Sequence, residues 1–234
     1  MPKIYNVIQG TPEWAHLRCG IPTASNFHRL ITPTGKVSTQ SEMYLFELLA
    51  ERITGEPTVE FTSHWQDRGS EMEAEAVAYF EFQRECETAK VGFITNDDGT
   101  IGCSPDRLIG EDALLEIKVP KPATHVMYLL KKAVDAVYYP QVQGQLWVSG
   151  RSYLDIMSYC PSMPPAIVRV HRDSDFIKLL ETSLDSFRIQ LDGHTGWLQE
   201  RGWITEGRAS VTEQDELISA LKDSLRSMKG NASE

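Results

Sequence analysis

The sequence predicts an α/β (α+β) fold in which a central mixed β-sheet is flanked by helices. Three observations support this prediction. Helical periodicity dominates residues 40–87, strand-like alternation with turn signals dominates residues 91–119, and helical and strand-like segments alternate from there to residue 200. The 234 residues, 41% of them hydrophobic and 24% charged, are enough for one domain with a substantial core.

The first regular element is predicted to be a helix, since residues 1–40 show only short irregular pieces. Thr39 and Glu42 have the spacing of a capping box, and Gly55 would end the helix after Thr54. Leucines and one isoleucine at helical spacing form its apolar stripe.

A second helix is predicted over residues 70–87. Its buried side contains Val77 and Phe80, and Glu73 lies one turn before Val77 on that same face. A carboxylate in this position lies either at the edge of the core or in a cleft.

Three strands are predicted next, as a meander. Residues 91–95 and 100–103 flank the sequence Asn-Asp-Asp-Gly, which favours a hairpin turn, and residues 113–119 form the third strand. In that strand Glu116 and Lys118 share the face opposite to the apolar side chains, because successive side chains alternate between the two faces.

Helices and strands then alternate through the C-terminal part of the chain. The predicted elements are, in order, helices over residues 124–133 and 140–149, strands over 153–158 and 166–171, and a long helix over 173–200. We expect residues 1–204 to form a single domain and residues 205–234 to form a helical extension or tail.

The net charge of −10 is unevenly distributed along the sequence. Residues 42–87 contain 12 acidic and three basic residues, which leaves 21 acidic and 20 basic residues in the rest of the chain. Residues 117–134 contain four lysines and no acidic residue. An acidic total usually argues against a nucleic-acid partner, but this distribution allows a local basic surface.

Secretion, membrane insertion and cysteine-based metal sites are not indicated by the sequence. The N-terminal residues lack the apolar segment of a signal peptide, and no apolar run approaches 18 residues. The four cysteines show no C-x-x-C spacing, which argues against a structural zinc or iron–sulfur site. Free thiols in such a chain favour the reducing cytoplasm as its location.

Three polar residues around the third strand could carry chemistry. Asp106 follows Pro105 at a break in the strand pattern, and Glu116 and Lys118 come ten and twelve residues later. Two antiparallel strands joined by a short turn would bring these side chains together. Paired carboxylates are hard oxygen ligands that suit Mg²⁺ or Mn²⁺, and a neighbouring ammonium can polarise a water. Metal-assisted hydrolysis of a phosphodiester requires such a set.

Each of these residues also has a structural interpretation. A Glu and a Lys that alternate on a strand usually form a solvated sheet face, and an Asp after proline is usually a turn residue. Glu73, taken alone, would be a residue of the helix surface or the core edge.

The combination of segments resembles a known nuclease family. Ser104-Pro105-Asp106 and Glu116-Ile117-Lys118 are the elements of the PD-(D/E)xK superfamily, whose core is restriction-endonuclease-like. Five segments, in order, resemble those of bacteriophage lambda exonuclease and the related YqaJ-type viral recombinases: residues 14–25, 68–81, 103–108, 115–120 and 138–150.

This resemblance implies a catalytic set. Asp106 and Glu116 would be the metal-binding carboxylates, with the carbonyl of Ile117 as a further ligand, and Lys118 would orient or deprotonate the attacking water. Glu73 matches the glutamate of the family's G-x-x-x-E helix and would serve a second metal or its waters.

A glutamine after the sheet belongs to the same set. Gln141 matches the family's glutamine near the site, and Gln143 and Gln145 are the alternatives.

The resemblance also implies a pocket for a terminal 5′-phosphate. Arg18, Thr23, Ser25 and Ser104 match the family's positions there, and a guanidinium with hydroxyls suits a phosphate. His64, with Arg68 nearby, would be the basic partner of that pocket. Without the resemblance, Arg18 would be a surface residue and residues 23–25 a helix N-cap.

The implied function is that of a metal-dependent deoxyribonuclease, a 5′-to-3′ exonuclease. It would use Mg²⁺, with Mn²⁺ as a substitute and two ions per site, to resect linear double-stranded DNA and leave 3′ overhangs for single-strand-annealing recombination. The resemblance further implies a homotrimeric ring, a single-strand annealing protein as partner, and the cytoplasm of a bacterium or phage-infected host. Lys121, Lys131 and Lys132 are expected to contact DNA, with most of residues 42–87 turned outward.

Three other functions stay open at this point. The chain could be a PD-(D/E)xK endonuclease, a RecB-like nuclease module, or a DNA-binding protein that does not cut.

Overall fold

The structure is a computed structural model, and it describes the chain in three ranges, 1–58, 64–133 and 135–204. For residues 64–71 only the backbone is described. Within these ranges no helix has the length and apolar character needed to cross a membrane.

The chain divides into two compact units, Met1–His194 and Thr195–Glu234. The extension predicted over residues 205–234 lies outside the described residues, so the domain boundary predicted after residue 204 stays a prediction.

The predicted fold class is confirmed, because a mixed five-stranded sheet in the order β2-β5-β6-β7-β8 is flanked by helices. A smaller antiparallel sheet has the order β1-β3-β4. The strands are β1 (Lys3–Tyr5), β2 (Thr88–Lys90), β3 (Phe93–Thr95), β4 (Gly102–Cys103), β5 (Arg107–Ile109), β6 (Ala113–Lys118), β7 (Tyr153–Ser158) and β8 (Ala166–His171). The helices, with the 3₁₀ helices marked η, are α1 (Pro12–Arg18), η1 (Ala24–Arg29), α2 (Ser41–Thr54), α3 (His64–Arg84), α4 (Pro122–Lys131), η2 (Ala136–Tyr138), α5 (Tyr139–Ser149) and α6 (Ser174–Gln199).

The predicted meander is wrong. The hairpin of β3 and β4 belongs to the small sheet, whereas β6 pairs with β5, a three-residue strand that the sequence pattern did not indicate. Pro105 separates β4 from β5, and it has no N–H with which to continue a strand ladder. The chain therefore leaves one sheet and enters the other at the Pro-Asp sequence.

The two early helices differ from their predictions at the ends. Helix α2 ends at Gly55 as predicted, with φ 71°, but the capping box is wrong because Gln40 precedes the helix and makes no side-chain cap. Helix α3 begins at His64, six residues before the predicted start. Residues 1–40, predicted as irregular, contain β1, α1 and η1.

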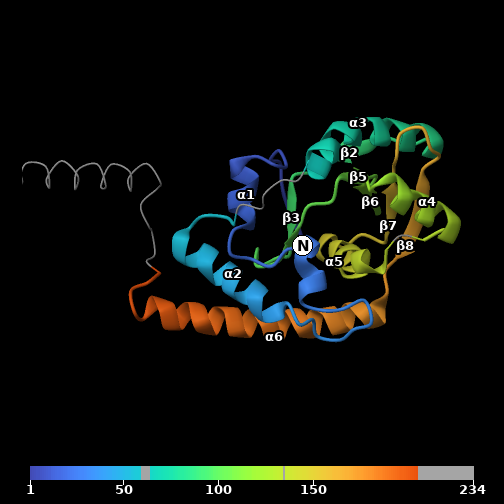
Figure 1. Cartoon of the computed structure of the whole chain (residues 1–234). Coiled ribbons are helices and arrows are strands. Elements are labelled where there is room, and N and C mark those ends of the chain that lie inside the picture. Colours follow the sequence, from blue (N-terminus) through green and yellow to red (C-terminus); the bar gives the residue numbers. More distant parts are fainter. Residues whose placement is uncertain (59–63, 134, 205–234) are drawn as a thin grey trace, which may run out of the picture. The chain divides into compact units, whose positions relative to one another are not determined.

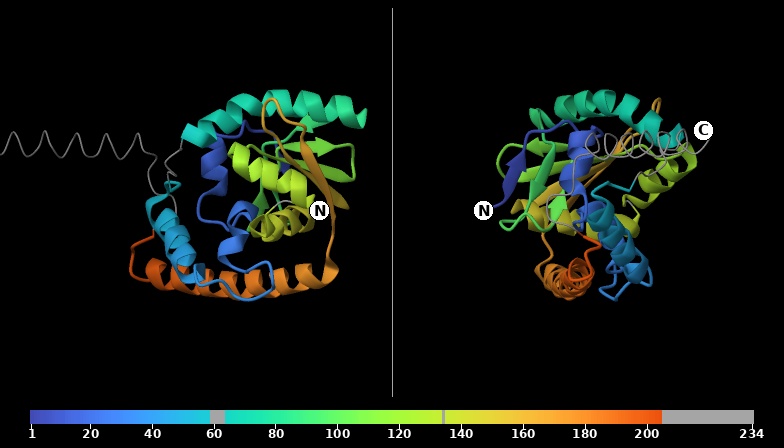
Figure 2. Two further views of the ribbon diagram at one scale, coloured as in Figure 1. Left: turned by 45° about the vertical axis from the view of Figure 1, so that its right-hand side comes forward. Right: turned by 90° about the vertical axis from the view of Figure 1, so that its left-hand side faces the viewer.

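Helices α3 and α5 cover opposite faces of the large sheet (Figures 1 and 2). Leu115 and Ile117 of β6 pack against α3, while Leu114 packs against Val142 and Leu146 of α5. The strand alternation therefore places Glu116 on the α5 side of the sheet.

Helix α5 also packs closely on η1, at a glycine. A Cβ atom on Gly144 would lie 2.3 Å from Cδ2 of Phe27, which is fully buried. This close approach fixes α5 against the segment that contains Thr23 and Ser25.

Replacing Gly144 with alanine should therefore destabilise the fold, because the added methyl has no room. We expect a loss of about 1–3 kcal/mol, the usual cost of overpacking, measured as a lower midpoint in thermal unfolding. Gly193→Ala is the matched control, since a Cβ at that position of α6 meets nothing within 4 Å. Equal unfolding temperatures for the two variants would contradict the packing described.

Candidate active site

A cavity of about 420 Å³ lies where the N-terminal segment, α3, β6 and α5 meet. Eleven of the residues singled out from the sequence line it: Arg18, Thr23, Ser25, Glu73, Ser104, Asp106, Glu116, Ile117, Lys118, Gln141 and its alternative Gln145. A larger and mainly apolar cavity of about 710 Å³, near η2, β8 and α6, contains none of them. The smaller cavity is therefore the candidate site.

The antiparallel pairing of β5 and β6 brings the two central carboxylates together. Arg107 is opposite Leu115, so the preceding Asp106 is beside Glu116. The backbone N–H of Ile117 donates to Oδ2 of Asp106 at 2.5 Å. Burial, followed by the negative charge of Glu116, raises the pKa of Asp106 well above its usual value.

Three donors hold the carboxylate of Glu116, which is 4% exposed. Nε2 of Gln141 donates to Oε1 at 2.8 Å, and Nζ of Lys118 donates to the same oxygen at 2.7 Å. Nε2 of Gln145 donates to Oε2 at 2.8 Å. Glu116 is therefore fixed in one orientation on its strand.

Lys118 provides a positive charge next to the carboxylates. Its Nζ lies 3.4 Å from Oε1 of Gln141 and 4.6 Å from the ring centroid of Tyr138. Burial by itself lowers the pKa of Lys118, but the charges of Glu116 and Asp106 outweigh it and raise that pKa. The side chain is thus held as an ammonium.

Glu73 lines the cavity and forms an ion pair with Arg107, a residue that the sequence does not predict as part of the site. Nη1 of Arg107 lies 2.6 Å from Oε1 of Glu73 and also donates to the carbonyl of Asp106 at 2.7 Å. The Arg107 side chain is 10% exposed. In the part of the chain that the structure describes, no three His, Cys, Asp or Glu side chains are grouped closely enough to hold a metal ion.

The donor set nevertheless fits a divalent cation. Asp106, Glu116 and the Ile117 carbonyl offer hard oxygen ligands of the kind that Mg²⁺ and Mn²⁺ prefer. Two carboxylates in one buried cavity repel each other, and a bound cation would relieve that repulsion.

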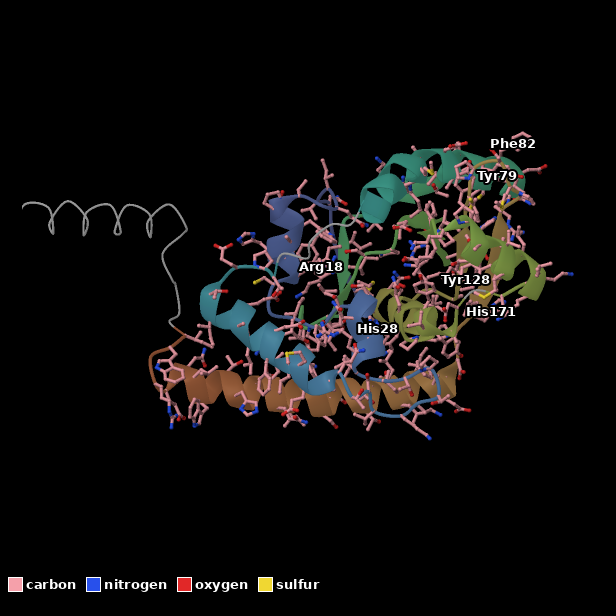
Figure 3. The ribbon with its side chains drawn as sticks, in the orientation of Figure 1. Arg18, His28, Tyr79, Phe82, Tyr128 and His171 are labelled. Carbon is pink, nitrogen blue, oxygen red and sulfur yellow. The ribbon has the colours of Figure 1, made fainter. Side chains whose placement is uncertain are left out.

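A second cluster at the same cavity contains a guanidinium and hydroxyl groups. Arg18, labelled in Figure 3 near the end of α1, stacks on Trp14 with its guanidinium carbon 3.9 Å from the ring centroid. Arg18 also donates to Oγ of Ser25 at 3.3 Å, and Oγ of Ser25 lies 3.3 Å from Oγ1 of Thr23. Nε1 of Trp14 donates to Oγ of Ser104 at 2.9 Å, so the indole links both sides of the cluster.

Comparison with known proteins identifies the family. Residues 13–152 match the YqaJ-like viral recombinase domain. The chain belongs to this family. No curated protein sequence matches the chain.

Solved structures agree with the YqaJ-like assignment. The chain is similar to an alkaline exonuclease from Laribacter hongkongensis, with 29% identity, a TM-score of 0.75, and coverage of 82% of this chain and 98% of that one. The same enzyme in complex with dAMP gives a TM-score of 0.74 at equal identity and coverage. A phage-related exonuclease from Haemophilus somnus 129PT has 15% identity and a TM-score of 0.62, over 76% of this chain and 96% of that one, which shows the fold alone. The fold is that of the alkaline exonucleases, and this YqaJ-like chain is a nuclease.

The lysines that the charge distribution predicts as DNA contacts lie away from the cavity. Lys121, Lys131 and Lys132 are exposed at the ends of α4 and do not line the site. His64 begins α3, but its side chain and that of Arg68 lie outside the described residues.

The glutamines of α5 have separate partners. Gln141 and Gln145 both reach Glu116, whereas Gln143 donates to the carbonyl of His171 and accepts from the N–H of Asp173. The sequence predicts Gln145 only as an alternative to Gln141. Their spacing of four residues, one helical turn, was the signal that both could face the site.

Proposed function

We propose that this protein is a Mg²⁺-dependent exonuclease that removes nucleotides from the 5′ ends of linear double-stranded DNA and leaves 3′ overhangs. The nuclease class rests on the family and on the likeness to the alkaline exonuclease of Laribacter hongkongensis. The direction of digestion, the metal and the substrate end are our proposal. The observation that carries it is one cavity that joins the carboxylates and Lys118 to the cluster around Arg18.

The carboxylate side of the cavity would perform hydrolysis. Asp106, Glu116 and the Ile117 carbonyl would hold Mg²⁺. The bound ion would supply an activated water and neutralise charge on the scissile phosphate. Lys118 would orient that water with its ammonium, which is already fixed by Glu116.

The number of ions depends on Glu73. The resemblance implies two ions per site, with Glu73 serving the second or its waters. In the structure Arg107 neutralises this carboxylate, so direct coordination by Glu73 would require the ion pair to open.

The Arg18 side of the cavity would bind the terminal 5′-phosphate. Charge-assisted hydrogen bonds from a guanidinium, supplemented by hydroxyls, suit a dianionic phosphate. Thr23, Ser25 and Ser104 would provide the hydroxyls, and His64 would be a further basic partner. A phosphate held there would set the distance from the chain end to the bond that is cut.

The ring and the annealing partner are proposed from the family resemblance alone, whereas the DNA-contacting lysines are proposed from the lack of acidic residues over residues 117–134. We propose that Lys121, Lys131 and Lys132 contact the DNA backbone, that three chains form a ring around the duplex, and that a single-strand annealing protein receives the overhang. The cytoplasm of a bacterium or infected host is the proposed location.

Digestion of linear and covalently closed circular DNA tests the proposed function. In Mg²⁺ we expect the linear duplex to be degraded and the circle to stay intact, and we expect EDTA to stop degradation. Cutting of the circle would favour an endonuclease instead. Binding of the linear duplex with no degradation in either Mg²⁺ or Mn²⁺ would favour a DNA-binding protein that does not cut.

A further inference from the structure

We propose that Gln145 is a positioning residue that fixes the carboxylate of Glu116 for catalysis, an inference that rests on the proposed nuclease function. Gln141 and Gln145 lie one turn apart on α5, and each donates its amide N–H to a different oxygen of Glu116 at 2.8 Å. The two amides therefore bracket the carboxylate, and rotation about its last bond would break both hydrogen bonds.

The two oxygens of Glu116 are not held equally. Oε1 accepts from both Gln141 and Lys118, whereas Oε2 accepts from Gln145 alone among the hydrogen bonds of the described residues. Glu116 is almost fully buried, so an oxygen deprived of its donor would be costly to leave unpaired. Without Gln145, Oε2 of Glu116 would have no hydrogen-bond donor among the described residues, and that side of the carboxylate would be free to move.

The orientation of the Gln145 amide agrees with this role. Gln145 is 1% exposed, and its Oε1 is one of two buried side-chain polar atoms in the described part of the chain that lack a hydrogen-bond partner. Turning the amide over would place that oxygen against the Glu116 carboxylate, with two acceptors facing each other. The orientation in which Gln145 donates to Glu116 is therefore the one that avoids this repulsion.

The neighbours of Gln145 on α5 keep it in place. Val142 and Leu146 pack into the apolar cluster on β6 and β7, which fixes the rotation of the helix about its axis. Gly144 allows Phe27 to approach the helix closely, which fixes its distance from η1. Gln145 is thus held by packed backbone, which is the requirement for a residue that positions another.

The test compares Gln145→Leu with Gln143→Leu, an identical change on the same buried helix. Mn²⁺ binding is measured by titration calorimetry, and kcat and KM are measured on linear duplex. Groups that orient metal-binding residues typically change metal affinity or activity by about 10–100-fold when removed. We expect Gln145→Leu to weaken Mn²⁺ binding or lower kcat to that extent, with KM for DNA unchanged.

The control should show the opposite pattern. Both ends of the Gln143 amide are hydrogen-bonded, to His171 and Asp173, so Gln143→Leu should lower the unfolding temperature more and leave Mn²⁺ affinity and kcat within about twofold of wild type. Gln145→Glu should impair Mn²⁺ binding or kcat at least as much as Gln145→Leu, because it places a second acceptor against Oε2 of Glu116.

The outcomes separate the two proposals. Wild-type affinity and kcat in Gln145→Leu would overturn the role of Gln145 and leave the nuclease proposal intact. Equal losses in Gln145→Leu and Gln143→Leu would show a structural role only, and would also overturn it. A wild-type protein that neither binds Mn²⁺ nor degrades linear DNA would overturn the proposed function itself.

Discussion

Replacing Asp106 with asparagine should lower the rate of degradation of linear duplex DNA by roughly 10³-fold, because metal-ion catalysis supplies several kcal/mol of stabilisation to the charged transition state. Asparagine keeps an oxygen that can accept from the N–H of Ile117, so the local backbone is preserved. What is lost is one of the two negative charges that would hold the cation. Rates on a 5′-phosphorylated linear duplex in Mg²⁺ measure the effect.

Folding of the Asp106 variant can be checked separately. Because Asp106 is close to Glu116 in a buried cavity, removing its charge should leave the unfolding temperature in EDTA equal to or above that of wild type. Asp112→Asn, in the exposed turn between β5 and β6, is the matched control and should degrade DNA at the wild-type rate. An Asp106→Asn variant that retains wild-type activity would mean that the reaction occurs elsewhere.

Replacing Arg18 with alanine should remove the preference for a 5′-phosphate. We expect wild type to degrade 5′-phosphorylated duplex with a higher kcat/KM than the 5′-hydroxyl duplex. Hydrogen bonds to a charged group are worth about 1.5–3 kcal/mol, which corresponds to roughly 10–100-fold. The ratio of the two kcat/KM values is the measurement, and in Arg18→Ala it should approach one.

The 5′-hydroxyl substrate is the internal control for Arg18. Its rate of degradation should change little in the variant, because the lost contact is to a phosphate that this substrate lacks. Arg18→Lys should keep only part of the preference, since an ammonium lacks the planar fork of the guanidinium. An Arg18→Ala variant that still discriminates between the two ends would contradict the assignment of the pocket.

The strands that carry the site could be predicted from sequence because their patterns are local. β6 alternates apolar and polar residues from Leu115 to Lys118 and follows a turn, and β7 and β8 have the predicted bounds. The short strand β5 has three residues, too few for a periodic signal, although it forms a tight hairpin with β6, which begins four residues after β5 ends. The meander was wrong for this reason.

The sequence does not predict which side chains form ion pairs and hydrogen bonds with one another in the site. Asp106, Glu116 and Lys118 could be grouped from their spacing and from the family resemblance. That Arg107 would pair with Glu73, or that Gln145 would join Gln141 on Glu116, depends on how α3 and α5 are placed against the sheet. Tertiary packing of those helices is not encoded in a local pattern.

Timed digestion of one linear duplex tests the central claim most directly. The duplex carries a 5′-phosphate on both strands, with label either at the 5′ ends or at the 3′ ends, and is incubated in Mg²⁺ or in EDTA. In Mg²⁺ the 5′ label should be released at once as mononucleotide, while the 3′ label stays on long single strands, and neither should be released in EDTA. Early release of the 3′ label, or release of either label in EDTA, would contradict a metal-dependent exonuclease that acts from 5′ ends.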